Sequence, residues 1–203
     1  MLRLSIFKAF IQRHVVFISP AVALICVATA VYSFKLLHEF ETTPGNQGQI
    51  TNAWPSSNHM ILDNTHATLI MFAHPRCTCS KASLQTLMRI VKESKSNSAS
   101  KIFFYVPKNA EAQWKENENW KIAESIPGVK VEEDLDGAIA AEFGAKTSGH
   151  TFLYSPQGSL IFSGGLTDTR GAAGNSKGRQ IILDYLVNQK HQENRIPVFG
   201  CEI

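Results

Sequence analysis

Two cysteines separated by a single residue, Cys77 and Cys79, have the clearest capacity for chemistry in this sequence of 203 residues. They follow the apolar run 67–72, which has the length of a buried strand, and they precede a segment with apolar side chains at helical spacing. A helix N-terminus stabilises a thiolate and so lowers the pKa of a cysteine placed there. Arg76 adds a positive charge at the same end. The position of the pair therefore predicts a reactive thiol centre.

The alternative for this pair is a structural disulfide, a common use of cysteine in an oxidising compartment. A bridge between Cys77 and Cys79 would close a very small ring, so we expect it to be strained and to stabilise the folded chain only slightly. Strained and exposed disulfides are the labile or catalytic ones. The spacing thus favours a functional pair over a structural bridge.

The other two cysteines, Cys26 and Cys201, lie far from this pair in the sequence. Cys26 falls inside a long apolar run, where a small apolar side chain that fills space is the simplest interpretation. Cys201 lies in the terminal segment 196–203, whose apolar residues a solvated terminus has little reason to keep together. We therefore expect this tail to fold back and bring Cys201 within disulfide reach of Cys77 or Cys79, at a Cα separation of roughly 4.4–6.8 Å. A tail cysteine that only packs is the alternative.

An apolar run without formal charge, residues 15–34, predicts a single transmembrane helix near the N-terminus. At a rise of about 1.5 Å per residue, a helix of this length spans roughly 30 Å, the thickness of the hydrocarbon core of a bilayer. Arg3, Lys8 and Arg13 precede the run, whereas the first acidic residue is Glu39. The positive-inside rule therefore leaves the N-terminus in the cytoplasm and exports the rest of the chain.

A cleaved signal peptide is the alternative to an anchor, because residues 28–30 have the small-x-small form of a cleavage site. The apolar run continues past that site to Phe34, which favours a retained anchor. Both interpretations export the domain that follows.

The net charge of +3 belongs to the N-terminus and not to the domain. Three of the 20 Lys and Arg residues precede the apolar run, and the remaining 17 are balanced by 17 Asp and Glu residues. Nucleic-acid affinity comes mainly from neutralising phosphates, so a neutral domain excludes this class of partner. The hydrophobic content of 44% and the mixed charge exclude a disordered chain, and the length suits one globular domain.

The expected elements after the anchor alternate between strands and helices. The expected strands are residues 67–72, 102–106, 129–131, 151–154 and 160–163, and the expected helices are residues 80–94, 111–125, 135–143 and 177–189. This order predicts an α/β fold with a mixed sheet, an antiparallel hairpin near its end and helices on both faces. The chain divides into a cytoplasmic N-terminus (1–14), an anchor (15–34), a linker (35–64) rich in Pro, Gly and Asn, a folded domain (65–190) and a tail (191–203).

The segment 72–80, Phe-Ala-His-Pro-Arg-Cys-Thr-Cys-Ser, resembles the strand-to-helix active-site segment of thioredoxin-like proteins, in which a Cys-x-x-Cys motif follows an F-x-x-P/W stretch. Under this resemblance Cys77 matches the attacking cysteine, and Ser80 stands where the resolving cysteine would be. Cys79 lies one position early, so the spacing departs from the family. The resemblance implies a thioredoxin-like fold behind the N-terminal helix, with Cys77 as the more nucleophilic thiol of the pair.

The chain resembles more closely the membrane-anchored bacterial proteins labelled RedB, which are thioredoxin-like. The likeness lies in the segments 74–79, 147–150, 162–165 and 198–201 and covers nearly all of the chain. It implies a single-pass protein of the bacterial inner (cytoplasmic) membrane, with its C-terminal domain in the periplasm or outside the cell. No biochemical role comes with this resemblance, so it supports the fold more than an activity.

His150 takes the place of the cis-proline that thioredoxins carry just before the strand facing the active-site cysteines. In that family the proline backbone binds extended substrate peptides and keeps metals away from the dithiol. An imidazole beside two thiols leaves room for a metal ligand set. The alternative is that His150 only packs or forms hydrogen bonds and supports the site by tuning the thiolate. His74, close before the cysteines, is a weaker candidate of the same kind.

Glycines are frequent in the segment 164–178, which in a thioredoxin-like fold borders the same face as the cysteines. Arg170, within this segment, can hold a thiolate or an anionic group of a partner. No Gly-Lys-Ser/Thr sequence follows, which argues against a phosphate-binding loop for nucleotides. A plain mobile loop is the alternative.

Thiol–disulfide exchange is the function that these observations predict, and it requires no cofactor. Cys77 attacks the disulfide of a partner, and Cys79 or Cys201 resolves the mixed disulfide. Arg76 and Arg170 support the thiolate. The expected partner is an envelope protein that carries thiols or a disulfide.

A non-enzymatic metal-binding protein or carrier is the alternative function, because soft thiolates select copper as Cu(I) or zinc as Zn(II). Its candidate ligands are Cys77, Cys79 and either Cys201 or His150. A thioredoxin-fold module that only binds a partner is a third hypothesis.

Overall fold

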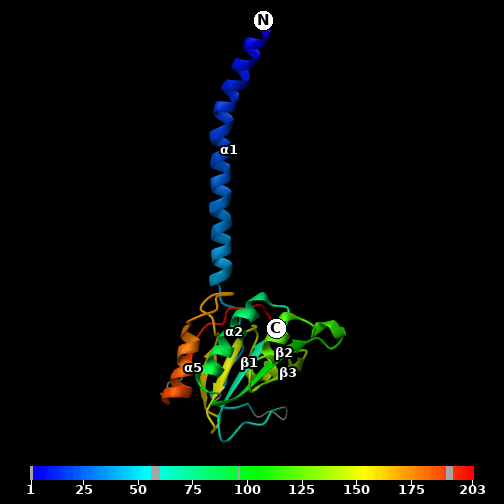
Figure 1. Cartoon of the computed structure of the whole chain (residues 1–203), viewed down its shortest axis with the longest axis vertical. Coiled ribbons are helices and arrows are strands. Elements are labelled where there is room, and N and C mark those ends of the chain that lie inside the picture. Colours follow the sequence, from blue (N-terminus) through cyan, green and yellow to red (C-terminus); the bar gives the residue numbers. More distant parts are fainter. Residues whose placement is uncertain (1, 56–59, 96, 191–193) are drawn as a thin grey trace. The chain divides into compact units, whose positions relative to one another are not determined.

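The computed structural model describes residues 2–55, 60–95, 97–190 and 194–203. The chain forms two compact units, Met1–Phe40 and Glu41–Ile203 (Figure 1). The first unit is a single helix, and the second holds a β-sheet with the helices that cover it.

Helix α1 (Leu2–Thr42) contains the expected apolar run. Its stretch Pro20–Thr42, with a mean hydropathy of 1.8, is long and apolar enough to cross a membrane, although a signal sequence meets the same criteria. Large apolar side chains along this stretch are exposed. The helix continues past Phe34, the expected end of the anchor, because the residues up to Thr42 include neither Gly nor Pro.

The second unit is built on one six-stranded mixed sheet with the order β3-β2-β1-β4-β5-β6. The strands are β1 (Ala67–Ala73), β2 (Ser98–Val106), β3 (Val129–Leu135), β4 (His150–Tyr154), β5 (Leu160–Gly164) and β6 (Asn194–Arg195). β1, β2 and β3 run parallel, whereas β4 is antiparallel to both β1 and β5. This mixed sheet confirms the expected fold class. β6, which runs parallel to β5, has no counterpart among the expected strands because two residues carry no periodic pattern.

Helices cover both faces of this sheet. They are α2 (Thr78–Glu93), α3 (Glu118–Glu124), α4 (Ala138–Phe143) and α5 (Lys177–Asn188), with a short 3₁₀ helix η1 (Ala112–Trp114). Buried side chains of α2, α3 and α5 belong to one apolar cluster, and those of α4 belong to a second cluster. Figure 1 shows α2 and α5 next to each other over the sheet. Two apolar layers therefore enclose the sheet.

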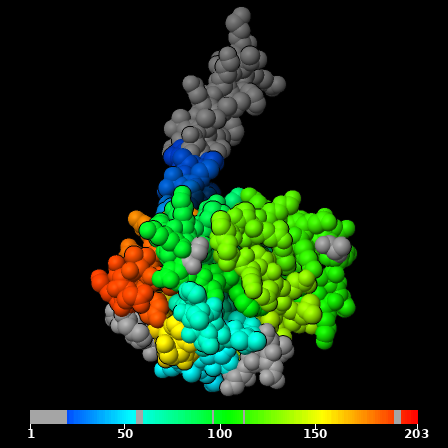
Figure 2. Space-filling view, turned by 60° about the horizontal axis from the view of Figure 1, so that its bottom comes forward, coloured from blue at the N-terminus to red at the C-terminus, as the bar shows by residue number. Residues whose placement is uncertain are grey.

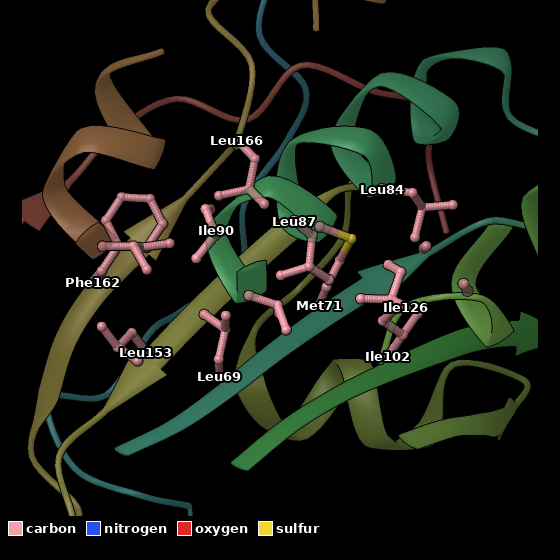
Figure 3. Close-up of a cluster of buried hydrophobic side chains, with 14 of the residues drawn as sticks. Leu69, Met71, Leu84, Leu87, Ile90, Ile102, Ile126, Leu153, Phe162 and Leu166 are labelled. Atoms are coloured by element: carbon pink, nitrogen blue, oxygen red, sulfur yellow. The ribbon is translucent and has the colours of Figure 1, made fainter. Parts of the chain in front are cut away.

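β1 is buried along its whole length and separates the two layers. Successive side chains of a strand point to opposite faces. Leu69 and Met71 therefore share one cluster with Leu87 of α2 (Figure 3), whereas Ile70 and Phe72 belong to the other cluster. Because both faces are covered, the end of β1 is held in place, and the chain leaves the sheet there to reach the cysteines.

One expected helix, residues 111–125, is interrupted in the structure. The first piece, η1, ends at Trp114, and α3 begins only at Glu118. Asn117 caps α3, since its side-chain oxygen accepts a hydrogen bond from the Trp120 backbone N–H at 3.0 Å. An Asn side chain satisfies a free N–H of a first turn, so it starts a helix better than it continues one. The prediction of one continuous helix is therefore wrong.

The expected linker, residues 35–64, lies partly on the domain. The Trp54 N–H donates to the Gly158 carbonyl oxygen, in the turn between β4 and β5, at 2.8 Å. The indole ring meets the rings of Phe143 and Tyr154 edge-on, at centroid distances of 5.4 and 5.1 Å. Figure 2 shows the cyan part of this segment against the yellow β4–β5 turn. A composition rich in Gly, Pro and Asn predicts a loop, but it does not separate a free tether from a loop bonded to a domain.

Replacing Trp54 by Ala should lower the free energy of unfolding of the second unit by about 2 kcal/mol, because two ring contacts and their buried area are lost. Ile61→Ala, in the same segment, is the matched control: Ile61 is 91% exposed. The control should change the free energy by less than about 0.5 kcal/mol. Denaturant unfolding of the full chain, followed by near-UV circular dichroism, measures both variants. Equal losses would show that Trp54 is not docked in solution.

Candidate functional site

Cys77 lies at the start of α2, where it is the N-cap residue with φ −83° and ψ 121°. Its backbone N–H donates to the His74 carbonyl oxygen at 3.2 Å, and its own carbonyl oxygen accepts from the Ser80 N–H at 3.1 Å. These two bonds close the turn between β1 and α2. The turn places the Cys77 side chain at the N-terminus of a helix of 16 residues, where the dipole favours a thiolate.

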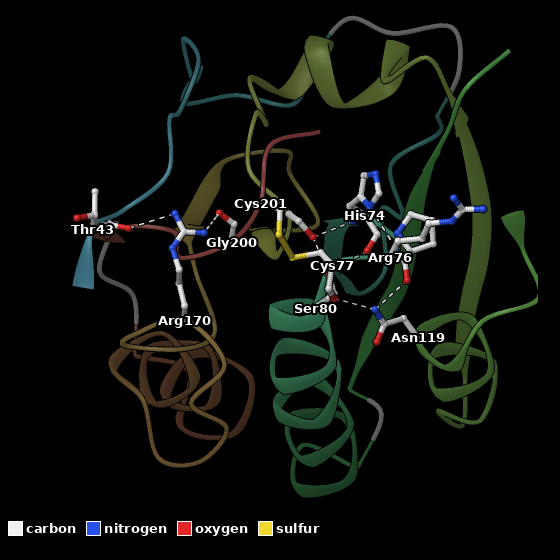
Figure 4. Close-up of a disulfide and its surroundings, with 11 residues drawn as sticks. Thr43, His74, Arg76, Cys77, Ser80, Asn119, Arg170, Gly200 and Cys201 are labelled. Atoms are coloured by element: carbon white, nitrogen blue, oxygen red, sulfur yellow. Dashed lines mark hydrogen bonds between the residues drawn. A yellow bond between two sulfur atoms is a disulfide. The ribbon is translucent and has the colours of Figure 1, made fainter. Parts of the chain in front are cut away.

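Cys77 forms a disulfide with Cys201, which lies 124 residues further along the chain (Figure 4). The two Cα atoms are 6.1 Å apart. The expectation that the tail brings Cys201 to within reach of the cysteine pair is confirmed. The bridge does not join the Cys-x-Cys pair, since Cys79 is free and buried. Cys26, in α1, is free and exposed.

The sulfur atoms of Cys77, Cys79 and Cys201 all lie within 4.8 Å of one another. Cys77 and Cys79 are only 3% and 8% exposed, whereas Cys201 keeps more contact with solvent. A groove of about 390 Å³, lined by residues 75–78, 117–119 and Lys81, opens beside Cys77. In the described part of the chain no other group of three His, Cys, Asp or Glu side chains converges in this way.

Backbone hydrogen bonds hold the tail on the domain. They run from Ile196 N–H to Ser163 O (3.0 Å), Gly165 N–H to Pro197 O (3.1 Å), Gly45 N–H to Val198 O (2.8 Å), Ser148 N–H to Cys201 O (2.7 Å) and Ile203 N–H to Lys146 O (3.1 Å). Thr147 and Glu202 form an antiparallel bridge between the last two of these bonds. Strand-like pairing with residues 146–148 therefore sets the position of Cys201.

Arg170 lies beside the tail and not beside the sulfurs (Figure 4). Its guanidinium group donates to the carbonyl oxygen of Gly200 and, at 3.4 Å, to that of Thr43. The sequence predicted that Arg170 supports a thiolate, but in the structure its guanidinium group contacts the backbone carbonyl group of Gly200, next to Cys201. Gly200 is needed at this point because a Cβ atom there would overlap the Ser148 carbonyl oxygen. Arg170 and Gly200 thus position Cys201.

The side chain of Arg76 points away from the disulfide (Figure 4). Its guanidinium carbon lies 4.1 Å from the centroid of the Trp114 ring, which is a cation–π contact. Three sources of thiolate stabilisation at Cys77 were expected: the helix N-terminus, Arg76 and Arg170. The structure brings only the N-terminus of α2 to the sulfur, and both arginines contact other groups.

His74 is half-buried between two aromatic rings. Its imidazole stacks on Tyr105 and meets Trp114 edge-on, at centroid distances of 5.8 and 5.6 Å. Burial lowers the pKa of His74, and the positive charge of Arg76 lowers it further. The Nδ1 atom accepts a hydrogen bond from the Arg76 backbone N–H at 3.1 Å. The ring therefore supports the loop as a neutral group.

Ser148 joins the tail to the loop that precedes Cys77. Its N–H bonds the Cys201 carbonyl oxygen at 2.7 Å. Its Oγ accepts from the His74 N–H at 2.8 Å and lies 2.6 Å from the Ser80 Oγ, which donates to the His74 carbonyl oxygen at 3.1 Å. Ser148 was part of the stretch that carried the family resemblance, but a serine in a loop shows no such role by its type or spacing.

Asn119 holds the same loop from the other side. Its side-chain amide is buried and donates to the carbonyl oxygens of Pro75 and Cys77, each at 2.9 Å. The sequence placed Asn119 in a polar helix and assigned it no function. An Asn in such a helix is ordinarily solvated, so only the packing of α3 against the loop reveals this contact.

His150 is not brought to the cysteines. Its imidazole is fully buried, stacks on Phe152 at a centroid distance of 4.2 Å, and its Nε2 lies 2.9 Å from the Ser163 Oγ. Burial lowers the pKa of His150 to about 3, so the ring is neutral. The converging ligand group consists of the three cysteines and does not include His150. The structure therefore matches the alternative interpretation, in which His150 packs and forms a hydrogen bond.

No protein-family model matches the chain, and no curated protein matches it either. Solved structures with a similar fold do match the chain. An uncharacterized conserved protein of Geobacillus kaustophilus is 21% identical, with a TM-score of 0.55 over 80% of this chain and 92% of that chain. A hypothetical protein of Sinorhizobium meliloti is 19% identical, with a TM-score of 0.58 over 78% of this chain and 97% of that chain. These likenesses concern the fold alone.

The central strands run in the order β3-β2-β1-β4-β5, with the cysteines at the β1–α2 junction. The fold is thioredoxin-like. A weaker likeness joins it to the exposed lipoprotein thioredoxin of Streptococcus pneumoniae, which is 18% identical, with a TM-score of 0.45 over 62% of this chain and 87% of that chain. A thioredoxin-like fold hosts more than one activity, so function has to be argued from the site.

Replacing His150 by Gln should flatten the pH dependence of stability. The pKa of His150 is about 3 in the folded chain, and that of an unfolded histidine is about 6.5. Between these values the unfolded chain binds the extra proton, so stability rises with pH by up to about 1.4 kcal/mol per pH unit and is lost as pH falls. His150→Gln removes this contribution.

The control for this variant is Leu153→Val, because it shortens a buried side chain of the same strand that carries no titrating group, and it should keep the wild-type slope. Denaturant titrations of the full chain at several values between about pH 4 and pH 6 give the slopes. A slope that His150→Gln leaves unchanged would contradict a neutral, buried imidazole.

Proposed function

We propose that this chain is a membrane-anchored, extracytoplasmic thiol–disulfide oxidoreductase. The observation that carries the proposal is the disulfide between Cys77, at the N-terminus of α2, and Cys201, in the docked tail. A helix N-terminus favours the thiolate that attacks, and a second cysteine held at bonding distance resolves the mixed disulfide. Arg170 supports the reaction by positioning the backbone that carries Cys201.

In the proposed reaction, the reduced chain transfers two electrons to the disulfide of a partner protein. The Cys77 thiolate attacks one sulfur of that disulfide, a mixed disulfide forms, and the second cysteine of the partner leaves as a thiolate and takes up a proton. The Cys201 thiolate then attacks the Cys77 sulfur, which forms the Cys77–Cys201 bond and releases the first cysteine of the partner. The partner is reduced and the chain oxidised. The same steps in reverse oxidise a dithiol.

The proposed location is the inner membrane of a bacterium, with α1 as the single anchor and the second unit on the outer side. The length and composition of the stretch Pro20–Thr42 support an anchor, and the basic residues before it support the orientation. The likeness of segments 74–79 and 198–201 to RedB-type proteins supports the same assignment. The partner is then an envelope protein that carries thiols or a disulfide.

Replacing Cys77 by Ser should lower the rate of disulfide reduction by several orders of magnitude, because the attacking atom is lost. Cys201→Ser should instead accumulate a mixed disulfide, because Cys77 still attacks but no tail thiol releases the partner. The rate is measured by the dithiothreitol-driven reduction of insulin by the full chain in detergent. The adduct is sought separately, on non-reducing gels, after the reduced chain has been freed of dithiothreitol and mixed with insulin. Cys26→Ser is the control and should keep the wild-type rate. Activity that survives Cys77→Ser would contradict the proposal.

Metal binding is a second candidate function, favoured by the convergence of three sulfurs within 4.8 Å. In the reduced chain, Cys77, Cys79 and Cys201 would supply three thiolates, a ligand set that suits Cu(I) or Zn(II). Two of these sulfurs are joined in the disulfide, so binding requires prior reduction. This site uses Cys79, whereas exchange through Cys77 and Cys201 does not.

Cys79→Ser therefore separates the two functions. It should lower the affinity of the reduced chain for Cu(I) or Zn(II) by at least about tenfold if the three sulfurs form a metal site. It should leave insulin reduction within about twofold of wild type if Cys77 and Cys201 carry the exchange. Competition with a chromophoric chelator under anaerobic, reducing conditions measures the affinity. Unchanged affinity would remove the metal site, and lost reduction would show that Cys79 takes part in exchange.

A further inference from the structure

The tail enters the site in the conformation of a bound peptide. Residues 200–203 are joined to residues 146–148 by the Ser148 N–H to Cys201 O bond, the Ile203 N–H to Lys146 O bond and the bridge between them. The cysteine of this extended segment is bonded to Cys77. A mixed disulfide with a partner protein needs the same arrangement, an extended segment whose cysteine lies beside Cys77.

The receiving edge, residues 146–148, belongs to none of the six strands. The tail supplies the hydrogen-bond partners of the Ser148 N–H and the Lys146 carbonyl group. Thr147 and Ser148 are each only 1% exposed under it. A short backbone edge that lacks a neighbouring strand binds extended peptides by main-chain hydrogen bonds. The edge is therefore suited to exchange one extended segment for another.

The position before the cysteine is restricted to glycine by this edge. A Cβ atom on Gly200 would overlap the Ser148 carbonyl oxygen, which is backbone and cannot rotate away as a side chain can. The carbonyl group of Gly200 accepts a hydrogen bond from the Arg170 guanidinium group. The edge thus recognises a segment by two features of the residue directly before its cysteine. That residue has no Cβ atom, and its carbonyl group accepts a hydrogen bond from Arg170.

We infer that residues 146–148 and Arg170 form the docking site for the redox partner, with selectivity for an extended segment that carries glycine directly before its reactive cysteine. This inference rests on the proposed function. The chain's own tail occupies the docking site in the disulfide-bonded state, and the partner segment takes its place after reduction.

The exchange of occupants follows the redox steps. A dithiol reductant breaks the Cys77–Cys201 bond, becomes a disulfide itself and leaves two thiols on the chain. The tail is then held by hydrogen bonds alone, and the partner segment displaces it. Cys77 attacks the partner's cysteine and expels the partner's second thiolate. The returning tail brings Cys201 to the Cys77 sulfur, so it releases the partner from the sulfur and from the edge together.

The test uses two peptides that differ at one position, Val-Phe-Gly-Cys-Glu-Ile and Val-Phe-Ala-Cys-Glu-Ile, each with its cysteine activated as a thionitrobenzoate mixed disulfide. The protein is the full chain in detergent with Cys26, Cys79 and Cys201 replaced by Ser, so that Cys77 alone reacts. Attack by Cys77 joins the peptide to the chain and releases coloured thionitrobenzoate. The glycine peptide should react at least about tenfold faster, the effect of losing roughly one good hydrogen bond at the edge.

A small reagent without a peptide, dithiobis(nitrobenzoate), distinguishes the ways in which this inference can fail. If Cys77 reacts with the reagent but reacts with both peptides at equal rates, the assignment of the docking site is wrong and the proposed function stands. If Cys77 reacts with none of the three, the proposed function fails and the inference fails with it.

Arg170→Gln gives a second measurement in the same Cys77-only chain. It should lower the rate at which Cys77 reacts with the glycine peptide several-fold relative to the rate with the small reagent, because the charged donor to the carbonyl group before the cysteine is lost. Arg89→Gln, which changes an exposed arginine on α2, is the matched control and should not change this ratio. An unchanged ratio for Arg170→Gln would remove Arg170 from the docking site.

Discussion

The burial of β1 on both faces is the constraint on which the site depends. Every residue from Ala67 to Ala73 is buried, so the strand is held in the middle of the sheet with α2 over one face and α4 over the other. Its neighbours are then set by register, and Phe72 at the end of β1 pairs with His150 at the start of β4. The loop that carries Cys77 must leave the sheet at this point, directly beside the segment 146–148 that receives the tail.

Neutral groups hold the cysteines together. The loop before Cys77 is bonded by the hydroxyl groups of Ser80 and Ser148 and by the Asn119 amide. The two nearby arginines contact other groups. Arg76 lies over the Trp114 indole ring, and Arg170 donates hydrogen bonds to backbone carbonyl groups. A fixed charge inside a buried site is costly unless it is paired, whereas hydrogen-bonded amides and hydroxyls are tolerated there. The N-terminus of α2 is therefore the local feature that favours a thiolate at Cys77.

The tail combines a covalent bond with hydrogen bonds that do not depend on it. Each backbone bond between the tail and the domain contributes roughly 1 kcal/mol net, so these bonds can keep Cys201 near Cys77 after reduction and still be broken by a competing segment. Holding the two sulfurs close makes the resolving step intramolecular and fast. One element therefore serves both the closure of the disulfide and the release of a partner.

The sequence by itself determined the order of the strands β1 to β5 and of the helices, apart from the interruption of the expected helix 111–125. It also determined the position of Cys77 and Cys79 between a buried strand and a helix, and the return of an apolar tail. These features follow from local hydrophobic periodicity and from the cost of exposing apolar residues, which can be evaluated within short segments. Only the tertiary structure decided that Cys77 pairs with Cys201 and not with Cys79, that His150 is not part of the converging sulfur group, and that Ser148 and Asn119 support the site. Those contacts join residues far apart in the chain, up to 124 positions for the disulfide, and depend on strand register and helix packing that no local pattern encodes.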